Sequence, residues 1–189
     1  MQQLLDRDPN VRILACAPNN SAADTITMKL SGRGKSQVFR LNALSRKIED
    51  MPKSLREFSS TNDNHVFAMP TAELLAKYRV VVSTCLSAGV PAGLGLKRGH
   101  FTHIFIDEAG QGKEPEIMVP ILSIADSKTN LVLAGDNKQL GPIIHSTLAS
   151  SLGLKTSYLS RMMERDIYKL ETGRGITCVL FFFFKLVVQ

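Results

Sequence analysis

The chain has 189 residues, of which 44% are hydrophobic and 21% charged, which is the composition of a globular domain with one sizeable core. Its formal net charge of +6 favours an anionic partner without identifying one. Three widely separated cysteines indicate neither a disulfide framework nor a zinc cluster, and no apolar run reaches the roughly 20 residues of a membrane span. The amino terminus also lacks the pattern of a secretory signal. We therefore expect a protein of the cytoplasm or nucleus, with no membrane partner.

Short apolar runs alternate with helix-like segments along most of the chain. The first run, residues 11–17, ends at Pro18-Asn19-Asn20 and precedes a helix-like segment, residues 21–30, for which Ser21 is the predicted N-cap. The later predicted elements are a strand at 38–41, a charged helix at 45–58, a loop at 59–65, a helix at 71–78, a strand at 80–84, a glycine-rich loop at 89–99, a strand at 104–106, a helix at 114–123, a strand at 131–134 and a helix at 157–170. Strands that alternate with helices predict an α/β fold with a doubly wound parallel sheet.

The end of the chain differs from the rest. Residues 172–189 contain four consecutive phenylalanines in an apolar stretch that has neither a helical nor an alternating period. We expect residues 1–171 to form the domain, and residues 172–189 to be a divergent hydrophobic tail that is either artefactual or a product of alternative splicing.

Two of the predicted strands end in polar, acidic sequence. Asp107 and Glu108 follow one apolar run, and Asp136 and Gln139 follow the next. Since the carboxyl ends of parallel strands meet at one edge of the sheet, we expect these side chains to lie close together. Such an arrangement suits nucleotide hydrolysis, in which one carboxylate holds Mg²⁺ and its neighbour activates water. For either motif alone, the alternative is a polar turn that caps the following helix.

Four segments of the chain carry a family resemblance: ILACAPNNSAADTI, VVVSTCLSAG, IDEAGQGKEPE and LVLAGDNKQLGP. Together they resemble the Upf-type branch of the superfamily-one helicases, and in particular the Armitage and Moloney-leukaemia-virus-ten RNA helicases, over roughly residues 11–168. The resemblance implies the first RecA-like domain of an enzyme that couples ATP hydrolysis to translocation along RNA and unwinding of RNA, in RNA silencing. It also implies RNA and RNA-silencing proteins as partners, and a cytoplasmic location that includes ribonucleoprotein granules.

The resemblance assigns nucleotide chemistry to the acidic motifs. Asp107 matches the aspartate that coordinates Mg²⁺, and Glu108 matches the catalytic base. Gln139 matches the glutamine that couples the γ-phosphate to domain closure, and Asp136 belongs to the same nucleotide-binding motif. ATP is the implied substrate, and Mg²⁺ is the implied cofactor.

The resemblance also assigns contacts with the RNA backbone. Pro18, Asn19 and Asn20 match one loop that grips nucleic acid, and Ser83 and Thr84 match a second. Contacts with phosphates carry no sequence information, which suits an enzyme that moves along any strand. A plain turn between a strand and a helix is the alternative for each loop alone.

One motif of such helicases does not occur in these residues. Gly34-Lys35-Ser36 resembles the end of the phosphate-cradling GxxxxGK[ST] loop. A match would require glycine at position 29, but that residue is Lys29. We therefore expect a RecA-like P-loop NTPase core that lacks its P-loop and the second RecA-like domain, and that is nearly inactive alone. The alternatives are a non-catalytic RNA- or protein-binding module of an RNA-silencing complex and a metal nuclease.

Overall fold

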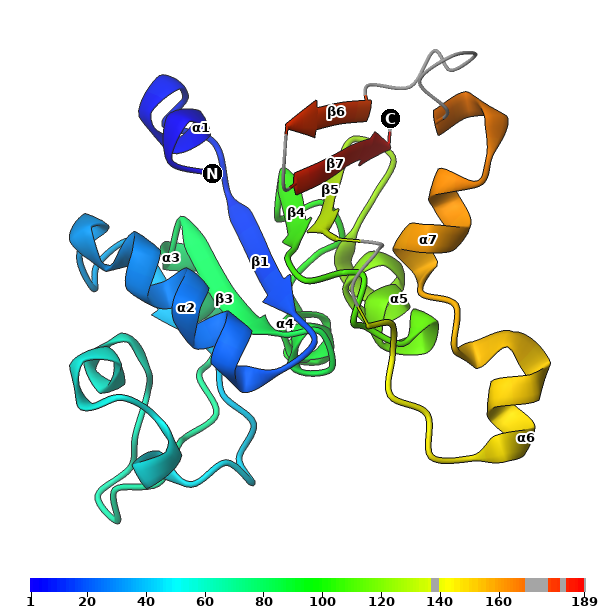
Figure 1. The fold of residues 1–189 in the computed structure, drawn as a ribbon. Coiled ribbons are helices and arrows are strands. Elements are labelled where there is room, and N and C mark those ends of the chain that lie inside the picture. The colour runs from blue at the N-terminus through cyan, green and yellow to red at the C-terminus, as the bar shows by residue number, and fades with distance from the viewer. Residues whose placement is uncertain (137–139, 169–176, 181–182, 189) are drawn as a thin grey trace.

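A computed structural model describes residues 1–136, 140–168, 177–180 and 183–188. Five parallel strands form the centre of the fold, in the order β2-β3-β1-β4-β5 (Figure 1). Their bounds are Ile13–Ala17 for β1, Val38–Arg40 for β2, Val80–Thr84 for β3, His103–Ile106 for β4 and Asn130–Gly135 for β5. The strands consist mainly of apolar residues, as is usual where both faces of a parallel sheet are covered.

Helices pack on both faces of this sheet. Alternate residues of β1 show it: Ile13 belongs to one buried cluster and Leu14 to the other, as the period of two in a strand requires. The cluster on the first face includes residues of α1 (Gln2–Arg7), α2 (Asn20–Leu30) and the 3-10 helix η3 (Lys53–Phe58). The cluster on the second face includes residues of α3 (Ala72–Lys77), α5 (Glu114–Ile124) and α7 (Tyr158–Met163). The predicted doubly wound α/β architecture is therefore confirmed.

Several predicted segments differ from the observed elements. The helix predicted at 45–58 is instead two 3-10 helices, η2 (Ile48–Asp50) and η3, because Pro52 keeps Met51 extended between them. The glycine-rich loop predicted at 89–99 is helical at its start, where η4 (Ser87–Gly89) ends and α4 (Val90–Gly93) follows. The last predicted helix ends early, since a 3-10 turn, Asp166–Tyr168 (η6), follows α7. The remaining helical turns are η1 (Ser31–Arg33), α6 (Thr147–Ala149) and η5 (Ser150–Leu154). No helix in the described part of the chain is long and apolar enough to cross a membrane.

The end of the chain extends the sheet. β6 (Thr177–Leu180) pairs antiparallel with β7 (Phe183–Val188), and β7 pairs antiparallel with β5 from Leu131 to Gly135. The described part of residues 172–189 thus forms two strands that extend the sheet beyond β5. Strand pairing uses backbone groups, so it does not require the side-chain period that this segment lacks.

Candidate functional site

The carboxyl ends of four strands align at one edge of the sheet. β1 and β3 are in register up to their last residues, Ala17 and Thr84. β4 is in register with both β1 and β5 up to its last residue, Ile106. The ladder continues past β4, where the backbone N–H of Asp107 donates to the carbonyl oxygen of Cys16 at 2.8 Å. The loops after these four strands therefore leave the sheet at the same edge, as the sequence predicted for the acidic motifs.

The loop after β4 and the end of β5 are joined through their backbones. The N–H of Ala109 donates to the carbonyl oxygen of Ala134 at 2.8 Å. Gly135 has a φ of +153° and lies so close that a Cβ atom there would be 2.9 Å from the nitrogen of Ala109 and 3.0 Å from that of Gly110. Only glycine allows this approach without displacing the backbone. The two acidic motifs consequently lie on loops that touch.

Asp107 and Glu108 are half-buried and held by local hydrogen bonds. Oδ1 of Asp107 accepts from the backbone N–H of Glu108 at 3.1 Å, and Oε2 of Glu108 accepts from Nε2 of Gln111 at 3.0 Å. Glu108 has a φ of +53°, a left-handed conformation that costs a non-glycine residue about 1 kcal/mol or more. The surrounding loop therefore holds Glu108 in a backbone conformation that is unfavourable for a non-glycine residue.

Asp107 fits the predicted role of a Mg²⁺ ligand. A carboxylate is a hard oxygen donor, and Asp107 lines a cavity of about 530 Å³ together with residues of α1 and α2. Mg²⁺ commonly takes one or two protein carboxylates and completes its shell with phosphate oxygens and water, so one carboxylate is enough. Within the described ranges, no group of three or more His, Cys, Asp or Glu side chains could hold a metal ion. Asp136 follows β5 directly and is half-buried, whereas Gln139 lies outside the described residues.

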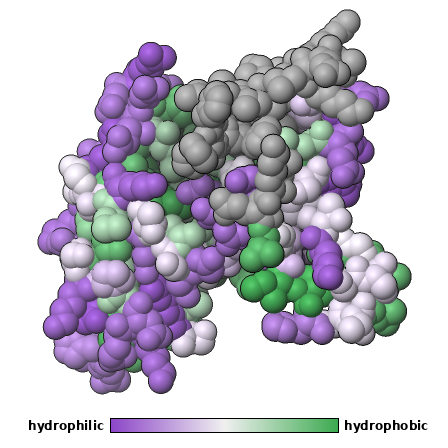
Figure 2. Space-filling model, viewed as in Figure 1, coloured by the Kyte–Doolittle hydropathy of each residue, from purple (hydrophilic) through white to green (hydrophobic). Residues whose placement is uncertain are grey.

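A second cavity, of about 980 Å³, connects the predicted nucleic-acid loop with the loops after β4 and β5. Pro18 and Asn19 line one side, and Gln111, Lys113 and Lys155 contribute polar and cationic groups elsewhere on its wall. Apolar side chains gather beside it, at the lower right of Figure 2, over the segment that leads into α6. The large exposed apolar residues here are Leu140 and Ile143 of this segment, Leu148 of α6 and Leu152 of η5.

Asn19 has a structural task in addition to its predicted contact with RNA. It is extended, with φ −136° and ψ 166°, and its side-chain oxygen accepts from the backbone N–H of Ala22 at 2.9 Å. Asn19 is therefore the N-cap of α2, and the prediction that Ser21 caps this helix was wrong. The N-cap lies two residues earlier than predicted, because the extended backbone ends at Asn19 rather than at Ser21.

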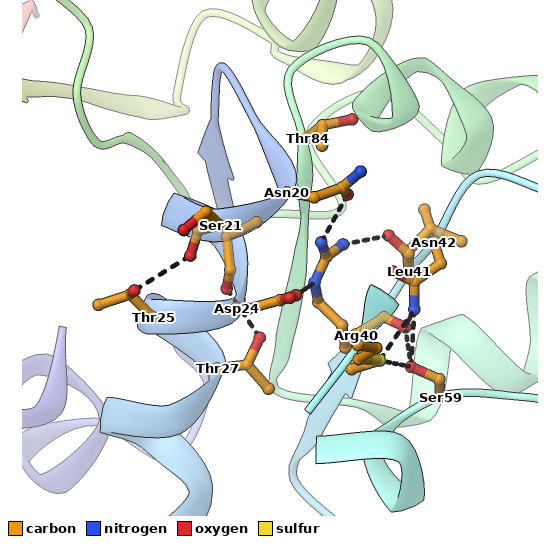
Figure 3. Close-up of polar contacts among 12 residues, drawn as sticks. Asn20, Ser21, Asp24, Thr25, Thr27, Arg40, Leu41, Asn42, Ser59 and Thr84 are labelled. Carbon is orange, nitrogen blue, oxygen red and sulfur yellow. Dashed lines mark hydrogen bonds and ion pairs between the residues drawn. The ribbon is translucent and has the colours of Figure 1, made fainter. Parts of the chain in front are cut away.

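Asn20 contacts a buried arginine that sequence reasoning missed (Figure 3). Arg40 of β2 is fully buried, and its Nη2 donates to Oδ1 of Asn20 at 2.9 Å. Its Nε donates to Oδ1 of Asp24 at 3.0 Å, and its Nη1 donates to the carbonyl oxygen of Leu41 at 2.7 Å. Burial lowers the pKa of Arg40 to about 10 against the opposing effect of Asp24, so the guanidinium stays charged at neutral pH. The available signal was a charged residue inside the apolar run at 38–41.

The second predicted nucleic-acid loop offers one side chain at the surface. Ser83 is fully buried, with its Oγ 3.9 Å from Sγ of Cys16. Thr84 is half-buried, and its hydroxyl donates to Oγ of Ser87 at 3.1 Å and accepts from the backbone N–H of Ser87 at 3.2 Å. The Thr84 hydroxyl thus stabilises the turn into η4, so contacts with a ligand here would come from Thr84 and the backbone rather than from Ser83.

Comparison with known proteins places this arrangement in a family. The AAA domain family matches residues 33–147, more than half of the chain, which include β3, β4, β5 and the ends from which the acidic loops leave. The chain belongs to the AAA domain family. Its five parallel strands and flanking helices form the predicted α/β, RecA-like core of such a domain.

Similar proteins support a narrower grouping for this AAA domain. It is 38% identical to the RNA helicase Mov10l1 of Homo sapiens over 173 residues, which are 90% of this chain and 14% of that protein. It is 40% identical to the helicase mov-10-B.1 of Danio rerio over 179 residues, 92% of this chain and 18% of that protein. It is 34% identical to the RNA helicase armi of Drosophila melanogaster over 191 residues, 91% of this chain and 16% of that protein.

These matches confirm the predicted resemblance of the AAA domain to the Armitage and MOV-10 helicases of superfamily one. The chain spans less than a fifth of the length of these relatives. Among solved structures, the C-terminal part of the Fun30 ATPase domain aligns with 88% of this chain and 52% of that chain, at 15% identity and a TM-score of 0.42.

Proposed function

We propose that this AAA domain is the RNA-binding part of an ATP-dependent RNA helicase. One observation carries the proposal: β1, β3, β4 and β5 end at the same edge of the sheet, so that the predicted RNA loops and the acidic loops share one surface. An RNA strand at the first two loops would thus lie beside a nucleotide at the last two. This adjacency would allow hydrolysis to be coupled to movement along RNA.

The nucleotide side of the site would work mainly by placing charged groups. In phosphoryl transfer the protein positions the reactants and stabilises charge, and Mg²⁺ held by Asp107 would neutralise the phosphates. The carboxylate of Glu108, oriented by its bond from Gln111, would accept a proton from the attacking water. Gln139 would couple the presence of the γ-phosphate to domain closure, and Asp136 would take part in nucleotide binding.

The RNA side would bind the sugar–phosphate backbone. The loop of Pro18, Asn19 and Asn20 offers backbone N–H groups and side-chain amides, which are donors that suit phosphate and sugar oxygens. The hydroxyl of Thr84 would donate to RNA only in place of its bond to Ser87. Such contacts do not depend on base sequence, as movement along RNA requires. The net charge of +6 favours the same anionic partner.

We further propose that these 189 residues alone bind RNA but hydrolyse almost no ATP. They contain no GxxxxGK[ST] sequence, so they supply no loop of that type to cradle the β- and γ-phosphates. Binding without hydrolysis would let the chain act as a non-catalytic RNA-binding module. Participation in RNA silencing and a cytoplasmic location stay predictions from the resemblance.

The test combines RNA binding with ATP hydrolysis. Fluorescence anisotropy of a labelled single-stranded RNA should show an affinity that falls with salt, by roughly 0.7 in the log–log slope for each phosphate contacted. ATP hydrolysis should stay at background with and without RNA. Absence of binding at low salt would contradict the RNA-binding proposal.

Two further outcomes separate the remaining alternatives. RNA-stimulated ATP hydrolysis that Glu108→Gln abolishes would contradict the proposed inactivity and show a complete ATPase. Mg²⁺-dependent cleavage of the RNA, followed on a denaturing gel, would instead identify a metal nuclease.

A further inference from the structure

Arg40 is a buried cation that joins β2 to α2 through its bonds to Asp24 and Asn20. It lies in β2 with none of its surface exposed, where a charge is tolerated only if it is paired and fully hydrogen-bonded. A well-packed apolar side chain is often at least as stabilising in such a place. The contacts of Arg40 therefore indicate what it does besides stabilising the fold.

Asp24 and Arg46 fix the orientation of the Arg40 guanidinium. Asp24 accepts from Nε of Arg40 at 3.0 Å, and it also accepts from both Nη atoms of Arg46, at 3.0 Å and 2.6 Å. Nη1 of Arg46 donates in addition to Oδ1 of Asn42 at 2.8 Å. The side chains of Asp24 and Arg46 are at most 9% exposed, so the network is shielded from water. These bonds leave the planar guanidinium little freedom to rotate.

The contact between Arg40 and Asn20 determines which way the Asn20 amide faces. A guanidinium carries only donors, so the group that it meets at 2.9 Å must be the amide oxygen of Asn20. The amide nitrogen is then directed to the opposite side. Figure 3 shows this nitrogen pointing away from Arg40, on the side where Thr84 lies at the end of β3. The two N–H groups of Asn20 therefore face the edge of the sheet.

We propose that Arg40 is a positioning residue, which orients the amide of Asn20 so that its N–H groups donate to a backbone oxygen of RNA between the ends of β1 and β3. Asp24 and Arg46 hold Arg40 in the orientation that this requires. The inference rests on the RNA binding proposed above and adds the group that directs one of its contacts. Arg40 itself is buried and touches no RNA.

A double-mutant cycle on the 189-residue chain tests this role. The variants are Arg40→Lys, which keeps the charge but loses the fork of donors, Asn20→Ala, and the two combined. We expect each single variant to weaken binding of labelled single-stranded RNA about tenfold, the effect of losing one hydrogen bond to a charged group. The double variant should bind no more weakly than Asn20→Ala alone. Arg33→Lys, at the opposite end of α2, is the matched control and should bind as the unchanged chain does.

Two results of the cycle would overturn the inference. One is an unchanged affinity for Arg40→Lys, and the other is a loss in the double variant equal to the product of the two single losses. If the unchanged chain binds no RNA, the proposed function fails and this inference fails with it. If the unchanged chain binds RNA and the losses multiply, only the inference about Arg40 fails.

A second variant keeps the test decisive if Arg40→Lys does not fold. Asn20→Asp retains the oxygen that Arg40 needs but replaces the outward N–H groups by a second oxygen. We expect it to lose RNA affinity without a lower thermal midpoint. Thr25→Asp places the same charge five residues further along α2 and should weaken binding less. Wild-type affinity in Asn20→Asp, or an equal loss in Thr25→Asp, would overturn the inference.

Discussion

Gly135, at the end of β5, packs directly on the backbone nitrogen of Ala109 in the loop after β4, with no side chain between them. A methyl group at Gly135 would lie 2.9 Å from that nitrogen, and the φ of +153° is one that other residues rarely adopt. We expect Gly135→Ala to lower the free energy of unfolding by about 1–3 kcal/mol, measured by urea denaturation.

Gly32 provides the matched control for this substitution. A Cβ atom there would meet nothing within 4 Å, and no positive φ is needed. Gly32→Ala should therefore change stability by less than about 1 kcal/mol, and in the stabilising direction, because alanine reduces the freedom of the unfolded chain. Equal losses of stability in Gly135→Ala and Gly32→Ala would show that the close contact at Gly135 is not the cause of the loss.

The cap of α2 allows the structural and RNA-binding roles of Asn19 to be separated. Asn19→Ala removes the acceptor for the N–H of Ala22 and should lower the free energy of unfolding by about 1 kcal/mol. Asn19→Ser keeps a capping oxygen and should leave stability nearly unchanged. If Asn19→Ser also weakens RNA binding, as anisotropy would show, the amide contacts RNA. If only Asn19→Ala weakens it, Asn19 acts through the helix.

The strands and the common edge of the site could be predicted because they depend on local patterns. Uninterrupted apolar runs such as residues 80–84 mark strands covered on both faces, and alternation with helices makes the sheet parallel. Parallel strands must end at the same edge, so the proximity of the acidic motifs followed without any knowledge of contacts. The touching backbones at Gly135 and Ala109 agree with that reasoning.

Features that depend on long-range contacts could not be predicted. Arg40 looks like an interruption of an apolar run until Asp24 and Asn20, on a separate helix, are brought to it. Ser83 and Thr84 are adjacent polar residues in the sequence, but alternation along β3 buries the first beside Cys16. The pairing of β7 with β5 uses backbone groups, which no side-chain pattern reports.

Because the backbone of Glu108 is left-handed, we expect glycine to be more stabilising than alanine at this position, the reverse of the usual order. Alanine normally stabilises a chain by about 0.5–1 kcal/mol relative to glycine, but in the left-handed region its Cβ costs about 1–2 kcal/mol. Both variants lose the carboxylate and its bond to Gln111 equally. With a φ of +53° at Glu108, we expect Glu108→Gly to be more stable than Glu108→Ala in urea denaturation. An alanine variant as stable as the glycine variant would contradict the conformation.

His100, near the amino-terminal edge of the sheet, makes stability depend on pH. Its Nε2 is buried without a hydrogen-bond partner among the described residues, and its ring packs edge-on against Phe101 with centroids 4.9 Å apart. Burial, and then the charge of Arg12, lower the pKa of His100 below the ordinary value of 6.5. As the pH falls below that value, the unfolded chain binds a proton more readily than the folded chain does. The contribution of His100 to stability is therefore present above the unfolded pKa and is lost progressively as the pH falls towards the folded pKa.

Replacing this histidine should remove that dependence on pH. We expect the thermal midpoint of His100→Phe to rise relative to that of the unchanged chain as the pH is lowered from about 7.5 to about 5. His145→Phe is the control, because the side chain of His145 lies at the surface and its replacement relieves no buried group. A difference in midpoint that stays constant with pH for His100→Phe would mean that the His100 ring takes up a proton in the folded chain as easily as in the unfolded one.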